Sequence, residues 1–385
     1  MIGFDIYSKK VLTSLRSLNN VSGSLKNAIT KKLSKTGTNL IRITAFQPNR
    51  MTAMSKLTQI IERHWQKPIF GLTLVLRPLS WLFGLGVQMR RSGYRLAYFK
   101  SECLPVSVVV VGNIHVGGSG KTPFVAALVK GLQNQGIKVG IVSRGYGRES
   151  RDIRLITPHD TAYDVGDEPL LLWQKTSAPV AVGADRVAAA RLLLDRHPET
   201  QVIVSDDGLQ HYRLYRDMEI VLLSSHHATH NLLPDGNLRE PLERLNSVDI
   251  LLINDEKTDF RLPESVAVFH LKTHYQPFYL LNNPHKTVTA DFFADKKVLA
   301  IAGIARPERF FNALKNMGIS CETQALPDHA AIAVSDIPTS QTVIITEKDA
   351  VKLNQENLPQ VYVLPIETEI NPELIDKVMT KCRLK

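Results

Sequence analysis

The segment from residue 106 to residue 136 combines residue types that bind a polyphosphate. The near-continuous apolar run VSVVVVGNI (106–114) is typical of a strand buried in a parallel sheet, and HVGGSGKTPF and the helical stretch VAALVKGLQNQG follow it directly. Glycines let backbone N–H groups approach phosphates, a lysine can reach the β- and γ-phosphates, and a threonine hydroxyl can bind Mg²⁺. The spacing therefore predicts a phosphate-binding loop made of His115, Val116, Gly117, Gly118, Ser119, Gly120, Lys121 and Thr122.

One position departs from the strict pattern for such loops. The pattern has glycine five residues before Gly120, and this chain has His115 there. The strand before the loop and the helix after it are the context that the motif requires. We therefore keep the interpretation of a phosphate-binding loop over that of a chance glycine-rich turn.

Two further segments carry carboxylates next to apolar runs. QVIVSDDG (201–208) ends a predicted buried strand with Asp206 and Asp207, and ligands bind at the carboxyl ends of strands in open α/β sheets. We expect one of these two aspartates to hold Mg²⁺ or its water. VGDEP (165–169) follows no clear strand and is predicted to be a loop that places Asp167 and Glu168 near a site. A plain helix cap is the alternative for this segment.

The formal net charge of +10 is distributed unevenly. Residues 1–100 carry 17 basic and 2 acidic side chains, whereas residues 101–385 carry 30 basic and 35 acidic ones. The hydrophobic content of 44% excludes a disordered chain, and the three cysteines have no paired spacing that would indicate a disulfide framework or a zinc site. A cationic front end on a mildly acidic protein indicates an anionic partner.

Residues 69–89, IFGLTLVLRPLSWLFGLGVQM, form the most apolar stretch of that front end. Arg77 and Pro78 near its middle disfavour a transmembrane span, and we expect a helix that begins near Pro78. Apolar and aromatic bulk followed by Arg90, Arg91 and Arg95 suits a helix lying at the headgroups of an anionic leaflet. An amphipathic helix packed on its own domain is the alternative, and a true span is the third option.

The remaining apolar runs predict an α/β fold with two sheet-containing parts. Expected strands lie at 138–143, 218–223, 249–255, 297–304, 341–349 and 361–367, and segments 266–272 and 277–281 resemble a ribbon between the two parts. We expect a P-loop NTPase-like α/β/α core and a smaller C-terminal α/β domain joined by that ribbon, with an N-terminal membrane-associated helix. The predicted segments are 1–53 (an extension of unknown role), 54–100 (membrane docking), 101–265 (the core), 266–285 (the ribbon) and 286–385 (the C-terminal domain).

Taken together, the motifs resemble the tetraacyldisaccharide 4'-kinase family, whose members phosphorylate the lipid A precursor. The resemblance runs in order from about Lys56 to Lys385. The stretches that carry it are PLSWLFGL, VVVVGNIHVGGSGKTP, VSRGYGR, VGDEP, GADR, SDDGLQH, LPDGNLREPL, VDILLIN, GIARPERFF, PDH and ITEKDAVK.

The resemblance implies a function, cofactors and a location. The cofactors would be ATP and Mg²⁺, and the γ-phosphoryl group would pass to the 4'-hydroxyl of the tetraacyldisaccharide 1-phosphate. The enzyme would work on the cytoplasmic face of the bacterial inner membrane, as a peripheral or monotopic protein. Two α/β/α domains joined by a ribbon would hold the site in the cleft between them.

The resemblance also implies roles for individual residues. Lys121 would act on the phosphates, and Asp167 would be the base, oriented by His329. The metal would lie among Thr122, Asp206, Asp207 and Glu240. The cleft would also hold Asn113 and Tyr146 near the acceptor, together with Glu168, Arg186, His211 and Arg239.

Two departures from the family's pattern concern loops near the site. Asp235 and Asn237 stand where Ala and Pro are common, which we expect to loosen that loop. Ala330, Ala331 and Ile332 follow His329 where the family tends to carry an aromatic residue.

Other function classes fit the sequence less well. A membrane-associated P-loop ATPase or nucleotide switch without a lipid acceptor is the main alternative, although a switch needs no base for an acceptor hydroxyl. Guanine specificity is not supported, because the lysine of Thr346-Glu347-Lys348-Asp349 stands one place late. Nucleic acid is not an expected partner, since the cations border an apolar run and are not interleaved in a recognition module. The oligomeric state and the acyl pattern of the acceptor stay open.

Overall fold

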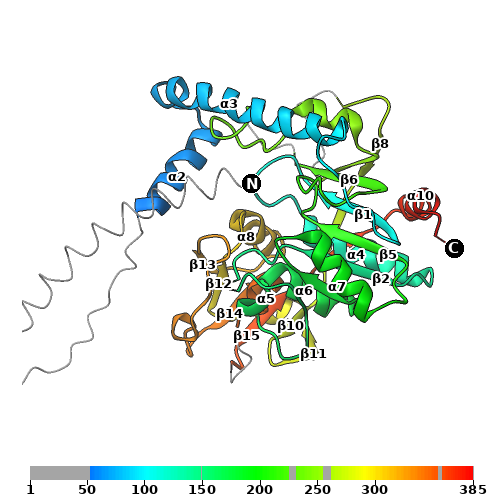
Figure 1. Ribbon diagram of the computed structural model, residues 1–385. Coiled ribbons are helices and arrows are strands. Elements are labelled where there is room, and N and C mark those ends of the chain that lie inside the picture. The colour runs from blue at the N-terminus through cyan, green and yellow to red at the C-terminus, as the bar shows by residue number, and fades with distance from the viewer. Residues whose placement is uncertain (1–52, 149, 225–230, 255–261, 354–357, 385) are drawn as a thin grey trace, which may run out of the picture. The chain divides into compact units, whose positions relative to one another are not determined.

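The structure is a computed structural model that describes residues 53–148, 150–224, 231–254, 262–353 and 358–384 (Figure 1). The chain divides into two units, residues 1–56 and residues 57–385. The described part of the first unit is the start of helix α2 (Ala53–Gln66). Apart from Ala53, the predicted extension 1–53 therefore lies outside the described residues.

The larger sheet of the second unit has eight strands in the order β3-β4-β2-β5-β1-β6-β7-β8. Neighbouring strands run parallel except for β3, which pairs antiparallel with β4. The strands are β1 (Ser107–Gly112), β2 (Val139–Ser143), β3 (Arg154–Leu155), β4 (Val180–Val182), β5 (Val202–Asp206), β6 (Met218–Leu223), β7 (Ile250–Ile253) and β8 (Ala267–His270).

Helices cover both faces of this sheet, which explains why its strands are apolar at nearly every position. In β1, Val109 and Val111 face one hydrophobic cluster, while Val108 and Val110 face another. The first cluster includes residues of α4 and α10, and the second includes residues of α7. A strand buried on both faces gains free energy from apolar side chains on each side. The helices are α4 (Lys121–Asn134), α5 (Ala162–Val165), α6 (Asp167–Thr176), α7 (Arg186–Arg196) and α10 (Pro372–Cys382), with the 3-10 helix η1 (Leu242–Ser247).

The smaller sheet has six strands in the order β11-β10-β15-β14-β12-β13. Its strands are β10 (Phe278–Leu280), β11 (Asn283–Val288), β12 (Val298–Ala302), β13 (Glu322–Ala325), β14 (Thr342–Thr346) and β15 (Val361–Leu364). It is accompanied by helices α8 (Pro307–Asn316) and α9 (Glu347–Ala350) and by the 3-10 helices η2 (Ala290–Phe293) and η3 (Val334–Asp336). Figure 1 shows the two sheets as separate bodies, with α10 returning from the smaller sheet to the larger one. The predicted fold class, an α/β protein with two sheet-containing parts, is confirmed.

The connecting ribbon differs from the expected one. Segments 266–272 and 277–281 do not pair with each other, because β8 joins the larger sheet and β10 joins the smaller one. The two-stranded ribbon pairs β9 (Lys272–Tyr275) with β16 (Ile366–Glu369) instead. Pro365 separates β15 from β16, where a single strand was expected. Proline has no N–H to donate to a ladder, so the chain can change sheets at this point.

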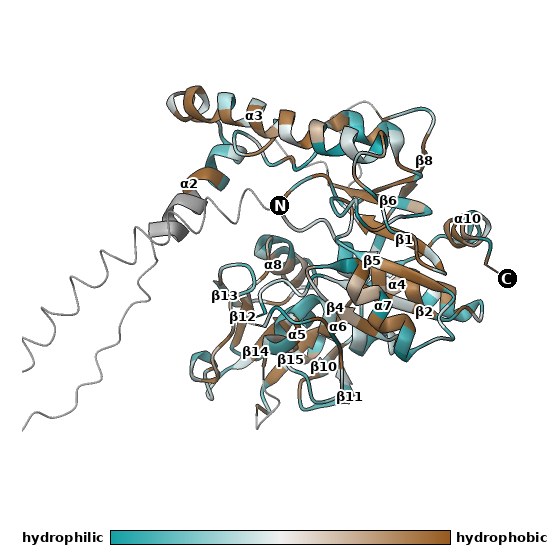
Figure 2. Ribbon diagram, in the orientation of Figure 1, coloured by the Kyte–Doolittle hydropathy of each residue, from teal (hydrophilic) through white to brown (hydrophobic). Residues whose placement is uncertain are grey.

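Helix α3 (Phe70–Arg95) corrects a second expectation. It begins at Phe70 and continues through Pro78, where a helix start was predicted. Of the helices that the structure describes, it is the one whose length and composition would allow it to cross a membrane. One face packs inward through Leu76, Ser80 and Gly84. The other face exposes large apolar side chains, among them Phe70 (80%), Trp81 (71%) and Leu82 (66%), and Figure 2 shows the apolar residues along this helix.

Candidate active site

The predicted phosphate-binding loop connects β1 to α4. Gly117 and Gly120 adopt positive φ values of 106° and 84°, so a side chain at either position would be strained. The Asn113 amide donates to Ser119 Oγ at 3.3 Å, and the Asn254 amide donates to the Ser119 carbonyl at 3.1 Å. The loop is therefore fixed by Asn113 of its own segment and by Asn254 at the end of β7. Helix α4 begins directly at Lys121.

A second loop, residues 231–239, lies along the start of the phosphate-binding loop. The Val116 N–H donates to the Asn237 carbonyl at 2.8 Å, and the Arg239 N–H donates to the Ile114 carbonyl at 2.6 Å. These two hydrogen bonds flank an antiparallel bridge between His115 and Leu238. The histidine at the glycine position of the motif is thus buried in a short strand-like pairing.

Asp207 lies between two cations. Lys121 Nζ lies 3.3 Å from one carboxylate oxygen, and Arg239 Nη1 lies 3.1 Å from the other. Burial opposes ionisation of Asp207, but these two cations outweigh it and lower the pKa of the carboxyl well below its usual range. Asp207 is an ionised bridge between the phosphate-binding loop and the loop 231–239.

Asp206 occupies a different environment from its neighbour. Ser143 at the end of β2 donates to Asp206 Oδ2 at 3.1 Å, while Oδ1 has no hydrogen-bond partner among the described residues. Burial, with smaller contributions from the charges of Glu168 and Asp207, raises the pKa of Asp206 to about 7. A buried carboxylate with an orphaned oxygen is a site that a cation would stabilise.

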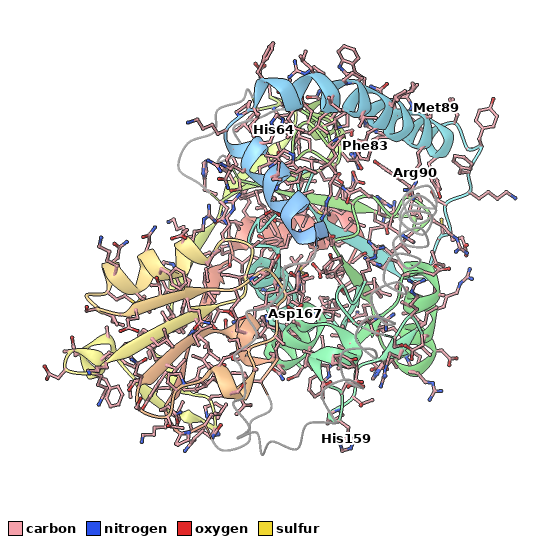
Figure 3. The ribbon with its side chains drawn as sticks, turned by 90° about the vertical axis from the view of Figure 1, so that its left-hand side faces the viewer. His64, Phe83, Met89, Arg90, His159 and Asp167 are labelled. Carbon is pink, nitrogen blue, oxygen red and sulfur yellow. The ribbon has the colours of Figure 1, made fainter. Side chains whose placement is uncertain are left out.

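Asp167 and His329 are brought together from the two sheet-containing parts of the chain. Asp167 is the first residue of α6, and Figure 3 shows it between the two parts. The His329 Nδ1 atom lies 2.9 Å from Asp167 Oδ2 and 3.1 Å from Oδ1. His329 is in the left-handed backbone region, with φ 62°, and its N–H donates to the Gly303 carbonyl.

Each member of this pair shifts the other's proton affinity. Burial works against the charge of Asp167, but the His329 hydrogen bond and the Lys348 charge lower its pKa below the usual value. Burial also works against the charge of His329, yet the hydrogen bond to Asp167 raises its pKa. The geometry is that of a carboxylate held ionised by an imidazole.

Lys348 at the start of α9 connects the same two parts. Its Nζ lies 3.0 Å from Glu168 Oε1, 3.5 Å from Asp328 Oδ1 and 4.0 Å from Asp167 Oδ2. The charges of these carboxylates raise its pKa despite burial. Glu168, predicted to lie near the site, therefore contacts this lysine and also contributes to the raised pKa of Asp206.

Arg186 lies near the two aspartates, and His211 lies near Arg186. Arg186 is buried at the start of α7, and its Nη1 donates to the Gly183 carbonyl at 2.9 Å. Burial lowers its pKa to about 10, against the charges of Asp207 and Asp206. Burial and the Arg186 charge lower the pKa of His211 to about 4, so its imidazole is neutral at pH 7.

Three further predicted residues, Glu240, Asn113 and Tyr146, have different surroundings from one another. Glu240 accepts a hydrogen bond from Tyr212 Oη at 2.7 Å and lies 3.8 Å from Arg244 Nε. No three His, Cys, Asp or Glu side chains gather as a metal site within the described ranges. Asn113 lies inside the phosphate-binding loop, whereas Tyr146 is exposed, with its ring centroid 5.0 Å from that of His329.

Sequence reasoning missed three residues that hold this arrangement, namely Ser143, Asn254 and Lys348. Ser143 ends β2, Asn254 directly follows β7, and Lys348 lies two residues after the end of β14. The carboxyl ends of parallel strands lie along one edge of a sheet, where ligands bind. Applying that rule to every predicted strand, and not only to the strand before Asp206, would have found them.

The fold and this edge of the larger sheet define a P-loop nucleotide-binding enzyme, with a phosphate-binding loop, buried acidic side chains and a carboxylate–imidazole pair. Comparisons with known proteins narrow this class. The family model described as tetraacyldisaccharide-1-P 4'-kinase (LpxK) matches residues 72–383. This chain belongs to that family.

Two relatives and one solved structure illustrate the similarity. The tetraacyldisaccharide 4'-kinase of Neisseria meningitidis serogroup A is 49% identical over 331 residues, which is 85% of this chain and 96% of that protein. The protein of the same name from Chromobacterium violaceum is 43% identical over 336 residues, 85% of this chain and 99% of that protein. The crystal structure of LpxK from Aquifex aeolicus in complex with ATP has a TM-score of 0.71 and 29% identity, covering 81% of this chain and 99% of that one.

Proposed function

We propose that this protein transfers the γ-phosphoryl group of ATP to the 4'-hydroxyl of the tetraacyldisaccharide 1-phosphate precursor of lipid A. The observation that carries the proposal is the Asp167–His329 contact, at 2.9 Å, in the same unit as the phosphate-binding loop. Hydrolysis of ATP alone needs no carboxylate to accept the proton of an acceptor alcohol. The names of the relatives at 49% and 43% identity supply the identity of the acceptor.

In this mechanism the phosphate-binding loop holds the nucleotide. Backbone N–H groups from Gly117 to Gly120 and the first turn of α4 bind the phosphates, and the helix dipole adds to their attraction. Lys121 moves its charge from Asp207 towards the β- and γ-phosphates. Asp207 stays ionised through Arg239, at 3.1 Å, so it keeps that arginine in place while the lysine is engaged.

A magnesium ion fits the residues beside this loop. Asp206 Oδ1 is buried without a hydrogen-bond partner in the described part of the chain, and oxygen ligands are those that Mg²⁺ prefers. Asp206 and the Thr122 hydroxyl would hold it, with Asp207 nearby. When bound, Mg²⁺ would neutralise charge on the β- and γ-phosphates.

Asp167 accepts the proton of the 4'-hydroxyl. As the bond between the 4'-oxygen and the γ-phosphorus forms, the bond from the γ-phosphorus to the β,γ-bridging oxygen breaks, and ADP leaves. The hydroxyl proton passes to an oxygen of Asp167, whose carboxylate His329 holds in position. Arg186, near Asp206 and Asp207, supplies a fixed positive charge beside the phosphates.

The lipid acceptor reaches this site from a membrane surface in our proposal. Helix α3 would lie on the anionic cytoplasmic leaflet of the inner membrane with its exposed apolar face in the acyl region. Arg77 no longer argues against membrane contact, because its Nε donates to Asp235 at 3.1 Å on the protein side. Cations near the end of the helix, Arg90 and Arg91, would meet lipid phosphates.

The decisive experiment is transfer of radiolabelled phosphate from ATP to the tetraacyldisaccharide 1-phosphate by the purified protein in detergent. We expect a labelled lipid that depends on ATP, on Mg²⁺ and on Asp167. ATP hydrolysis that proceeds without any labelled lipid, and that lipid does not affect, would favour the alternative of a membrane-associated ATPase or switch.

A further inference from the structure

The junction of helices α2 and α3 is tied to the loop 231–239 by a buried carboxylate, Asp235. Only 2% of Asp235 is exposed. His64 Nε2 lies 3.2 Å from its Oδ1, and Arg77 Nε donates to its Oδ2 at 3.1 Å. The amide of Asn231 also donates to Oδ2 at 2.9 Å. Figure 3 shows His64 where α2 approaches α3.

The hydrogen bonds of His64 determine how this tie is made. Its Nδ1 accepts the N–H of Ile69 at 3.0 Å, the residue that caps the N-terminus of α3. A neutral imidazole with Nδ1 as acceptor carries its proton on Nε2, which therefore donates to Asp235. The positive charge that balances Asp235 comes from Arg77, and His64 supplies a neutral hydrogen bond. Asp235 was expected to loosen this loop, and it instead fastens the loop to both helices.

Further contacts hold the same loop against the helices. Trp65 Nε1 donates to the Pro234 carbonyl at 2.9 Å, and Ser80 Oγ donates to the Leu232 carbonyl at 2.7 Å. A side chain on Gly84 would come within 2.7 Å of the Leu232 side chain, so α3 and the loop pack closely at this position. The loop is closed on itself by the Leu233 N–H donating to the Leu238 carbonyl at 2.9 Å.

The other side of the loop contacts the nucleotide site. Asn237, two residues after Asp235, accepts the Val116 N–H of the phosphate-binding loop, and Arg239 reaches Asp207. A buried carboxylate deprived of its partners must be solvated, which requires the loop to move. Because the loop is closed on itself, such a movement would shift the Asn237 carbonyl and the Arg239 side chain together.

We infer that Asp235 is a positioning residue that couples the seating of α2 and α3 to the nucleotide site. It touches neither nucleotide nor acceptor, and it acts through Asn237 on Val116 and through Arg239 on Asp207. The helix pair proposed to dock on the membrane therefore helps to shape the phosphate-binding loop. The inference deepens the proposed function and rests on one part of it, namely that the phosphate-binding loop binds ATP.

The test compares the ATP dissociation constants of the full-length protein and its variants, measured by calorimetry in detergent without lipid. His64→Gln and Asp235→Asn each remove part of the tie while keeping a side chain of similar size. We expect each to weaken ATP binding about fivefold or more, and the double variant to be little weaker than either single one. Arg77→Gln should weaken binding similarly, whereas Arg77→Lys, which keeps the charge, should recover most of the affinity.

Arg191→Gln, on α7, is the matched control. It removes a 2.6 Å hydrogen bond from an exposed arginine to Glu102, outside the loop 231–239, and should leave ATP affinity unchanged. Melting temperatures recorded for every variant separate positioning from stability. Lower melting temperatures with ATP affinity within twofold of the parent would overturn the inference, and so would a loss of affinity in Asp235→Asn that His64→Gln does not share.

The failure of the proposed function would look different. A parent protein that binds ATP but labels no lipid would contradict the kinase proposal and leave the comparison of ATP affinities intact. A parent protein that does not bind ATP would contradict both.

Discussion

Asp167 and His329 are 162 residues apart in sequence, and their side chains meet at 2.9 Å. One begins a helix beside the larger sheet, and the other follows a strand of the smaller sheet. If Asp167 is the general base, as we propose, that base is assembled only while the two parts are in contact. Catalysis would then depend on this interface, which Lys348 and the Lys175–Glu347 ion pair at 2.7 Å also hold.

Replacing Asp167 with Ala removes the proposed base. We expect the turnover number for lipid phosphorylation to fall by about 10²- to 10⁴-fold, the range typical of general-base catalysis. ATP affinity should survive, because the phosphate-binding loop lies on a different element. Steady-state kinetics measures the turnover number, and nucleotide titration measures the ATP affinity. A loss of ATP binding as large as the loss of turnover would contradict the assignment of Asp167 as base.

The Asp167–His329 pair should make stability depend on pH in a defined window. The folded-state pKa of His329 is raised and that of Asp167 is lowered, so each charged form is favoured by folding. The pair's contribution is therefore fully present above the unfolded aspartate pKa of about 3.9 and below the unfolded histidine pKa of about 6.5. It is lost as pH rises through the raised pKa of His329.

Urea denaturation of the parent and of His329→Gln over this range measures the effect. The difference between their free energies of unfolding should be constant from about pH 4.5 to 6 and should shrink at higher pH. A difference in the free energy of unfolding that grows as pH rises above about 6 would contradict the conclusion that folding raises the pKa of His329. Replacement of the exposed His159, which lies away from Asp167 in Figure 3, serves as the control.

Lys348 should influence the acid limb of the pH–rate profile. Its charge is one of the causes that lower the pKa of Asp167, so Lys348→Met should raise that pKa. The acid limb of the profile of turnover number against pH would then lie at higher pH than in the parent. Lys348→Arg, which keeps the charge, should leave the limb closer to that of the parent. An unshifted limb in Lys348→Met would show that its charge does not act on the base.

Metal removal tests the proposed Mg²⁺ site. Chelation with EDTA should abolish lipid phosphorylation, and added Mg²⁺ should restore it. Asp206→Asn replaces a charged oxygen ligand by a neutral one, so the Mg²⁺ concentration for half-maximal rate should rise about tenfold or more. Glu240→Gln is the comparison, because Glu240 was also expected to bind the metal but lies next to Tyr212 and Arg244. It should change the Mg²⁺ requirement less than Asp206→Asn does. A larger Mg²⁺ shift in Glu240→Gln than in Asp206→Asn would contradict the assignment.

The exposed face of α3 should determine binding to lipid. Trp81→Glu and Leu82→Glu each replace an apolar side chain, 71% and 66% exposed, by a charge. Each should weaken binding to anionic vesicles about tenfold or more, since a large buried side chain contributes about 1.5–3 kcal/mol. Vesicle flotation measures this, and Val334→Glu, 52% exposed on the smaller-sheet part, is the control. Equal loss in the control would indicate a general effect of charge.

The sequence by itself determined the chemistry of this protein and the order of its elements. The apolar runs identified β1, β2, β5, β6, β7, β12 and β14, because strands buried on both faces need apolar residues at consecutive positions. The phosphate-binding loop could be recognised as well, since its glycines, lysine and threonine act through local backbone geometry.

The resemblance to the family already implied that His329 orients Asp167, but the residues by themselves did not, because that contact depends on how the two sheets face each other. The contacts of Lys348 and the surroundings of Asp235 were decided by the tertiary structure, since no local pattern encodes them. The course of α3 through Pro78 and the strand exchange at Pro365 were likewise set by packing that overrides local preference. Asp235 looked like a residue that would loosen a loop, but its partners lie 158 and 171 residues away, on helices that the fold brings against it.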